Sequence, residues 1–143
     1  MRLDIIIGAM ISLLSTAFGA FMSYYLNEKK LRGRALLELR EELRDNLEIL
    51  IDFKKRAKKQ TAIPPIYTDA YISARSLGLL TNLPKDVRKK LAHVYLKLLF
   101  LKQLSLASTF GLLLIEDWNK FVDEIERLIN EINELLNKLG NCN

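Results

Sequence analysis

The stretch "EDWNKFVDEIERLINEINELLNKL", residues 116–139, has the clearest periodicity in the chain and determines its fold class. Its large apolar residues recur at intervals of three and four over three heptads: Trp118, Phe121, Ile125, Leu128, Ile132, Leu135 and Leu139. This spacing predicts an α-helix with one apolar face. Val122, Ile129 and Leu136 widen that face. A broad apolar face is typical of a helix in a multi-helix core.

Two other long helices are predicted upstream of this stretch. Residues 28–60 carry apolar positions three and four apart, at Leu36, Leu39, Leu43, Leu47, Leu50 and Phe53. Asn46 falls on the same seam, where a polar residue commonly sets helix register. A third helix, from about Pro84 to Leu106, is apolar nearly all round, as a central bundle helix would be.

The connection between these helices contains a short helix of its own. "TAIPPIY", residues 61–67, has two prolines and no charge, and it predicts a turn. A short helix then follows from Asp69 to about Leu77, with Thr68 as its N-cap and Gly78 as its end. The body is thus predicted to contain three main helices and one short one.

The charges along the body change sign near its end. Residues 27–60 carry eleven basic and seven acidic groups, and residues 61–110 carry seven and two. Residues 111–143 carry three basic and seven acidic groups. We therefore expect the last helix to pack antiparallel to the basic helices, with neutralisation between their surfaces.

The N-terminal segment has no charge from Ile5 to Leu26. These 22 positions correspond to about 33 Å of helix, close to the roughly 30 Å of a bilayer core. The sequence therefore predicts an all-α protein in which a single transmembrane helix, residues 1–27, precedes an antiparallel helical bundle, residues 28–143. By the positive-inside rule, the cluster Lys29, Lys30, Arg32 and Arg34 places the bundle in the cytoplasm and the N-terminus outside, with these side chains near lipid head groups.

Two alternatives concern this membrane assignment. The small residues around Ala17, Gly19 and Ala20 resemble a signal-peptide cleavage site, although the basic region before them is weak. Residues 98–115, with only Lys102 charged, are a candidate second span. Lys97 and Lys102 would each cost about 2.5–3.5 kcal/mol near the centre of such a helix, which argues against it.

Small residues in the N-terminal segment predict helix packing. Gly8, Ser12, Ser15, Gly19 and Ser23 recur at intervals of four, three, four and four, which places them on one helix face. Such a face lets two helix backbones approach closely. We therefore expect self-association, or packing on a partner helix, along this face.

A possible polar pocket is suggested by Asp69, Tyr71, Arg75 and His93, which lie close together in the sequence. Helix capping, an ion pair from Arg75 to Asp69 or Asp86, and tyrosines at a core boundary would also explain these residues. The chain has one histidine and one cysteine, Cys142, so no disulfide can form within it. We expect no catalytic residues, metal site or cofactor, and no enzymatic activity.

A basic cluster lies at the end of the 28–60 helix. It consists of Lys54, Lys55, Arg56, Lys58 and Lys59. Such a cluster can bind nucleic acid or an acidic partner. Few aromatic residues accompany it, which argues against nucleic acid.

The stretch from Asp69 to Tyr95 carries the pattern D-A-Y-x-x-A-R-x-x-G-x-L-x-x-L-P-x-x-x-R-x-x-L-x-x-x-Y. With the preceding apolar segment and charged helix, it resembles uncharacterised prokaryotic and mobile-element proteins that have an N-terminal membrane anchor and a cytoplasmic helical domain. The resemblance implies the same layout and no activity.

Taken together, these features predict a membrane-anchored scaffold or assembly module that acts through self-association or a protein partner. A small pore-forming or lysis-type effector is the alternative function. Binding of nucleic acid or of an acidic partner through residues 54–59 is a third.

Overall fold

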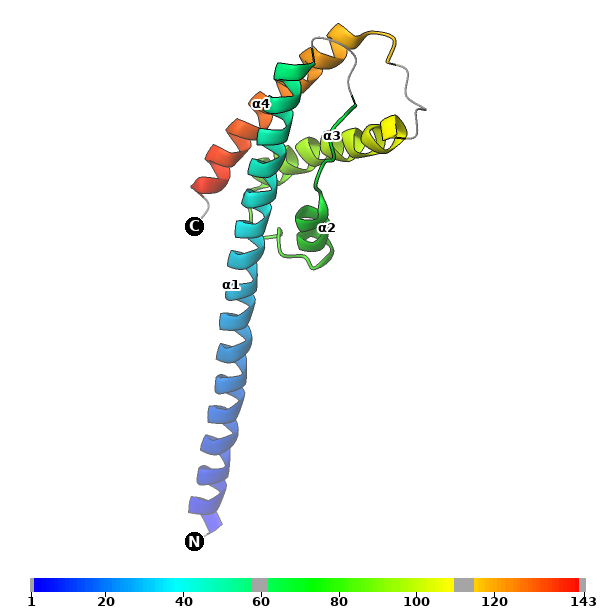
Figure 1. Cartoon of the computed structure of the whole chain (residues 1–143). Helices are drawn as coiled ribbons and strands as arrows, with labels where there is room; N and C mark the ends of the chain where they lie inside the picture. The colour runs from blue at the N-terminus through cyan, green and yellow to red at the C-terminus, as the bar shows by residue number, and fades with distance from the viewer. Residues whose placement is uncertain (1, 58–61, 110–114, 142–143) are drawn as a thin grey trace. The chain divides into compact units, whose positions relative to one another are not determined.

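The computed structural model describes residues 2–57, 62–109 and 115–141, and residues 2–6 and 9 by their backbone only. The chain forms two compact units, residues 1–34 and residues 35–143, which are considered separately below. Four helices and no strand are present in the described ranges: α1 (Arg2–Arg56), α2 (Asp69–Ser76), α3 (Lys85–Thr109) and α4 (Trp118–Gly140) (Figure 1). The prediction of an all-α helical bundle is confirmed.

The predicted transmembrane helix over residues 1–27 is not supported by the structure. Among the described residues, no helix combines the length and the apolarity needed to cross a bilayer. The predicted single-pass location in the cell membrane, with the N-terminus outside and the bundle cytoplasmic, is therefore wrong. The topological role predicted for Lys29, Lys30, Arg32 and Arg34 depended on that span and is withdrawn with it.

The physical reason is that an uncharged segment need not be a strongly apolar one. From Ile7 to Leu26, glycine, serine, threonine and tyrosine fill eight of 20 positions. Their polar or small side chains lower the mean hydropathy of any long window through this part of α1. The side chains of residues 1–6 and 9 lie outside the described part of the chain.

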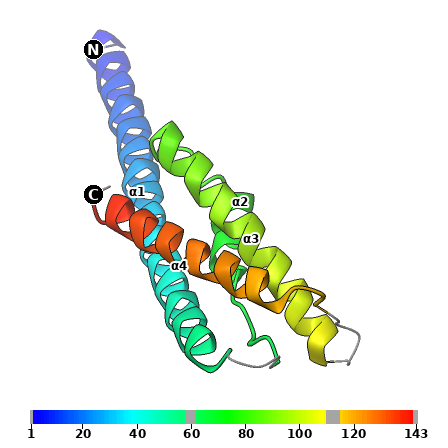
Figure 2. The ribbon, with the colours of Figure 1, turned by 90° about the horizontal axis from the view of Figure 1, so that it is seen from above.

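The unit of residues 35–143 is held together by one apolar core. In Figures 1 and 2, α4 packs across α3 and across the part of α1 that belongs to this unit. The largest completely enclosed apolar side chains come from these three helices and are Leu39, Leu43, Leu50, Leu91, Leu98, Ile132, Leu135 and Leu139. Those of α1 and α4 follow the predicted spacing of three and four, so the predicted faces of these two helices are the ones that pack. The prediction that α3 is central and covered nearly all round is wrong, because Leu96, Phe100 and Leu106 are exposed.

The segment of residues 62–68 crosses this bundle without regular structure and is fixed by side chains from two helices. Asn46, which is fully buried in α1, donates from Nδ2 to the carbonyl of Tyr67 over 2.6 Å. Its Oδ1 accepts from the Tyr67 backbone N–H over 2.9 Å. Ser105 of α3 donates to the carbonyl of Ile63 over 3.0 Å. Asn46 therefore positions a neighbouring segment through both backbone groups of one residue.

The C-terminal end of α2 follows its predicted signal. Gly78 has φ of +68°, a left-handed conformation that favours glycine. Its N–H donates to the carbonyl of Arg75 over 3.1 Å, and the N–H of Leu79 donates to that of Ala74 over 3.0 Å. These two bonds form a Schellman motif, which ends the helix and satisfies its last carbonyls.

The antiparallel packing of α4 on α3 is confirmed by ion pairs that run in opposite order along the two helices. Lys97 pairs with Glu131 over 2.7 Å, Lys90 pairs with Glu134, and Lys138 approaches Asp86 at 3.5 Å. The acidic surface of α4 thus meets basic side chains, as the charge distribution predicts.

Replacement of Asn46 by alanine should destabilise the bundle by about 2–4 kcal/mol, because both backbone groups of Tyr67 lose their partners. Urea unfolding followed by far-UV circular dichroism measures the change. The neighbouring Asp45 is exposed, so Asp45→Ala is the matched control and should stay within about 0.5 kcal/mol of wild type. Equal effects of the two substitutions would show that the Asn46 bonds do not hold the crossing segment.

Candidate functional site

The most elaborate polar arrangement in the bundle is built around Glu42 of α1. Its side chain is only 8 % exposed. Oε2 accepts from the backbone N–H of Ala70 over 2.7 Å, and Oε1 accepts from that of Tyr71 over 3.3 Å. Oε1 also accepts from the buried hydroxyl of Tyr95 over 2.8 Å. Glu42 thus caps the N-terminus of α2 from another helix, where an anion is favoured by the helix dipole.

Thr68, the predicted N-cap of α2, has a different role. It occupies the N-cap position but makes no side-chain capping bond. Its buried hydroxyl instead accepts from Nζ of Lys102 over 3.2 Å. Glu42 takes over the capping function, because its carboxylate reaches the free N–H groups that Thr68 leaves unbonded.

Tyr95 is the most strongly perturbed titratable group among the described residues. Its ring stacks on that of Tyr71, with centroids 4.1 Å apart and planes 8° apart. Burial raises the pKa of the Tyr95 hydroxyl far above its ordinary value of 10.0, and the charge of Glu42 and the hydrogen bond to it raise the pKa further. The hydroxyl therefore stays protonated and acts as a fixed donor, so it cannot serve as a base.

The four residues of the predicted polar pocket do not meet at one place. Asp69 approaches Lys102 at 3.4 Å. His93 lies 59 % exposed on α3, with Nε2 3.9 Å from Glu131 of α4. Only Tyr71 and Arg75 line a common depression, so the predicted set divides among three local environments.

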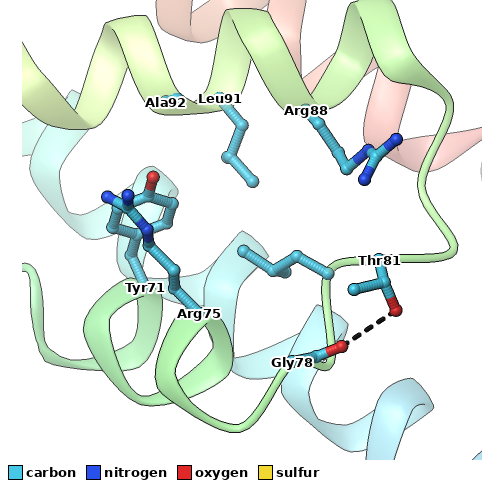
Figure 3. A pocket seen from close by; sticks show the side chains of 8 residues that line it. Tyr71, Arg75, Gly78, Thr81, Arg88, Leu91 and Ala92 are labelled. Carbon is cyan, nitrogen blue, oxygen red and sulfur yellow. Dashed lines mark hydrogen bonds between the residues drawn. The ribbon is translucent and has the colours of Figure 1, made fainter.

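This depression lies between α2 and the beginning of α3 and has a volume of about 230 Å³. Tyr71 and Arg75 reach it from α2, whereas Arg88 and Leu91 reach it from α3 (Figure 3). The remaining lining residues are Gly78, Leu80, Thr81 and Ala92. The Thr81 hydroxyl donates to the carbonyl of Gly78 over 3.0 Å and closes one edge.

The predicted basic cluster is partly neutralised within the chain. Lys54 pairs with Glu126 over 2.6 Å, and Arg56 pairs with Asp52 one turn earlier on α1. Lys55 is exposed, and Lys58 and Lys59 lie outside the described residues. The part of the cluster that the structure describes therefore offers fewer free charges than its composition indicates.

The unit of residues 1–34 presents an exposed apolar surface. Between residues 7 and 26, eleven large apolar or aromatic side chains are exposed, with fractions from 37 % to 71 %: Ile7, Met10, Ile11, Leu13, Leu14, Phe18, Phe21, Met22, Tyr24, Tyr25 and Leu26. Apart from the adjoining backbone of the helix itself, no atom lies within 4 Å of the position that a Cβ would occupy at Gly8 or Gly19. We call these eleven side chains the N-terminal apolar surface.

The carboxylate at the centre of the network is engaged in structural contacts. The described residues contain no group of three or more histidine, cysteine, aspartate or glutamate side chains that could hold a metal ion. The Glu42 carboxylate accepts hydrogen bonds from backbone N–H groups and from the Tyr95 hydroxyl, which keeps its proton. The network positions α2, and Arg75 and Arg88 line the depression.

Sequence reasoning did not identify Glu42. A signal was present, because Glu42 follows Leu39 by three residues and precedes Asn46 by four, which places its carboxylate on the apolar face of α1. A charge on such a face requires a buried partner. The partner itself, the start of α2, could not be inferred from spacing.

The raised pKa of Tyr95 predicts a loss of stability in alkali. Above pH 10 the unfolded state releases this proton while the folded state keeps it, so the free energy of unfolding falls by about 1.4 kcal/mol per pH unit from this group. Tyr95→Phe should remove that part of the decline, as measured by urea unfolding between pH 8 and about pH 11. Tyr67→Phe, a control at a 48 % exposed position, should retain it. Parallel declines for wild type and Tyr95→Phe would contradict the prediction.

Comparison with known proteins gives no family for this chain. No protein-family model matches it, and neither the curated proteins nor the solved structures contain a significant match. The resemblance to prokaryotic and mobile-element proteins stays a prediction, and the function has to be argued from the contacts and surfaces of the chain itself.

Proposed function

We propose that this protein is a helical assembly module that associates with copies of itself through the N-terminal part of α1. The observation that carries the proposal is the N-terminal apolar surface. The bundle of residues 35–143 is the body that such an assembly presents.

The size of the apolar surface supports this proposal. Residues 7–26 span about 30 Å of helix, and a cylinder about 10 Å wide has a side area of about 900 Å² over that length. The large apolar and aromatic side chains fill eleven of these 20 positions, so they cover about half of that area. The largest apolar patch on a typical monomer is about 300–600 Å². A helix that exposes a row of large apolar side chains normally packs them against other helices, and no other segment of the 1–34 unit covers them.

The distribution of side-chain sizes favours copies of the same helix as the cover. At about 100° per residue, Gly8, Ser12, Ser15, Gly19 and Ser23 form one narrow face, and the large apolar side chains occupy much of the opposite side. We call this face of small residues the shallow face. Large side chains of one copy fit against the shallow face of the next copy. Such a contact between unlike faces repeats and closes into a ring, so we expect more than two copies.

The absence of charge also favours self-association over an acidic or basic partner. Residues 7–26 contain no charged side chain, so repeated copies bring no like charges together along the contact. The nearest basic residue after the apolar surface is Lys29, beyond its end.

Light scattering of the full-length protein in a mild detergent, corrected for bound detergent, should give a discrete oligomer larger than a dimer. The double substitution of Gly8 and Gly19 by leucine fills the shallow face and should shift the mass to smaller species. Ala20→Leu adds the same bulk to a residue between the two faces and should leave the mass unchanged.

A monomer at all concentrations would contradict the proposal. A monomer that also floats with phosphatidylcholine vesicles would show that lipid, and not a second copy, covers the surface. An equal loss of mass in Ala20→Leu would remove the shallow face from the contact.

A further inference from the structure

We infer that the depression between α2 and α3 is a binding site for an organic oxyanion, that is, a phosphate or carboxylate group attached to a small apolar body. The inference rests on Arg75 and Arg88 and is independent of self-association, because all lining residues belong to the bundle.

The first observation is that both guanidinium groups lack an anionic partner. The nearby carboxylates are already engaged, since Asp69 approaches Lys102 and Asp86 approaches Lys138. Neither Arg75 nor Arg88 has an ion pair or hydrogen bond with another described side chain. The predicted ion pair from Arg75 to Asp69 or Asp86 does not form, so its charge is available to a ligand.

The second observation is the electrostatic environment at the start of α3. Arg88 lies in the first turn, together with Lys85, and Lys89 follows it. Cations at a helix N-terminus are unfavourable, because the helix dipole places positive charge there. The one acidic residue of this turn, Asp86, is engaged by Lys138. A bound anion would relieve the repulsion and would add favourable interaction with the dipole.

The third observation is the chemistry of the lining. Tyr71, Leu80 and Leu91 give the depression an apolar floor, and Figure 3 shows Arg75 and Arg88 rising from different helices beside it. The Thr81 hydroxyl donates to Gly78 and retains lone pairs. Guanidinium groups suit phosphate and carboxylate oxygens, which they bind in a bidentate manner, while the floor suits hydrocarbon.

The volume limits the ligand to a small one. About 230 Å³ is below the roughly 300–1,000 Å³ of sites for drug-sized molecules. A small molecule with a single ring or a short chain that carries one phosphate or carboxylate group fits these limits.

Saturation-transfer NMR on the full-length protein tests the site with three probes: phenyl phosphate, benzoate and benzyl alcohol. At low salt we expect at least one of the two anions to saturate with a Kd of about 1 mM, and neutral benzyl alcohol not to saturate. The anion that binds more tightly identifies the oxyanion. Added sodium chloride should weaken the binding.

Arg75→Gln and Arg88→Gln should each weaken the binding of that anion by about fivefold or more. Arg44→Gln is the matched control, because Arg44 is an exposed arginine of the same bundle that lies outside the depression. It should change Kd by less than about twofold. Thermal melts establish that the variants are folded.

Three outcomes would overturn the inference. These are no saturation by either anion, saturation by benzyl alcohol at the same concentration, and an equal loss in Arg44→Gln. Because the lining residues lie outside the oligomer contact, a failure here would leave the light-scattering result unaffected, and the reverse also holds.

Discussion

The contact of the Glu42 carboxylate with the start of α2 is the constraint on which the bundle depends. A buried carboxylate costs several kcal/mol unless its oxygens are hydrogen-bonded. Here three donors meet that requirement, and they come from α2 and from α3. One side chain of α1 therefore determines where two other helices lie. Asn46, one turn later, fixes the segment that leads into α2 through both backbone groups of Tyr67.

The ion pairs between α3 and α4 contribute to orientation more than to stability. Their side chains are partly or largely exposed, and such pairs are typically worth less than about 1 kcal/mol each. The stability comes from the enclosed leucines and isoleucines of α1, α3 and α4. The pairs of Lys90 with Glu134 and of Lys97 with Glu131 run in opposite order along α3 and α4. A parallel arrangement of the two helices would lose these pairs, so the charges favour the antiparallel direction of packing.

Both proposals start from side chains that have no partner within the described residues. The N-terminal apolar surface has no cover in its own unit. Arg75 and Arg88 have no anion, although Lys54, Lys90 and Lys97 each have one. Departures from the usual rules of packing and pairing are places where partners are expected. The proposed oligomer rests on the first of these features and the proposed oxyanion site on the second.

The sequence alone determined the helices of the bundle, because periodicity of apolar residues and the signals at helix ends are local. The heptads of α4, the glycine that ends α2 and the sign of charge on each helix all keep their predicted roles. The same local reasoning failed for residues 1–27, because it counted charges where the mean hydropathy decides. Only the tertiary structure decided the partners of Glu42, the separation of His93 from Arg75, and the placement of Arg75 and Arg88 around one depression. These depend on which helix faces which, and that arrangement is set by long-range packing, which residue spacing along one helix does not encode.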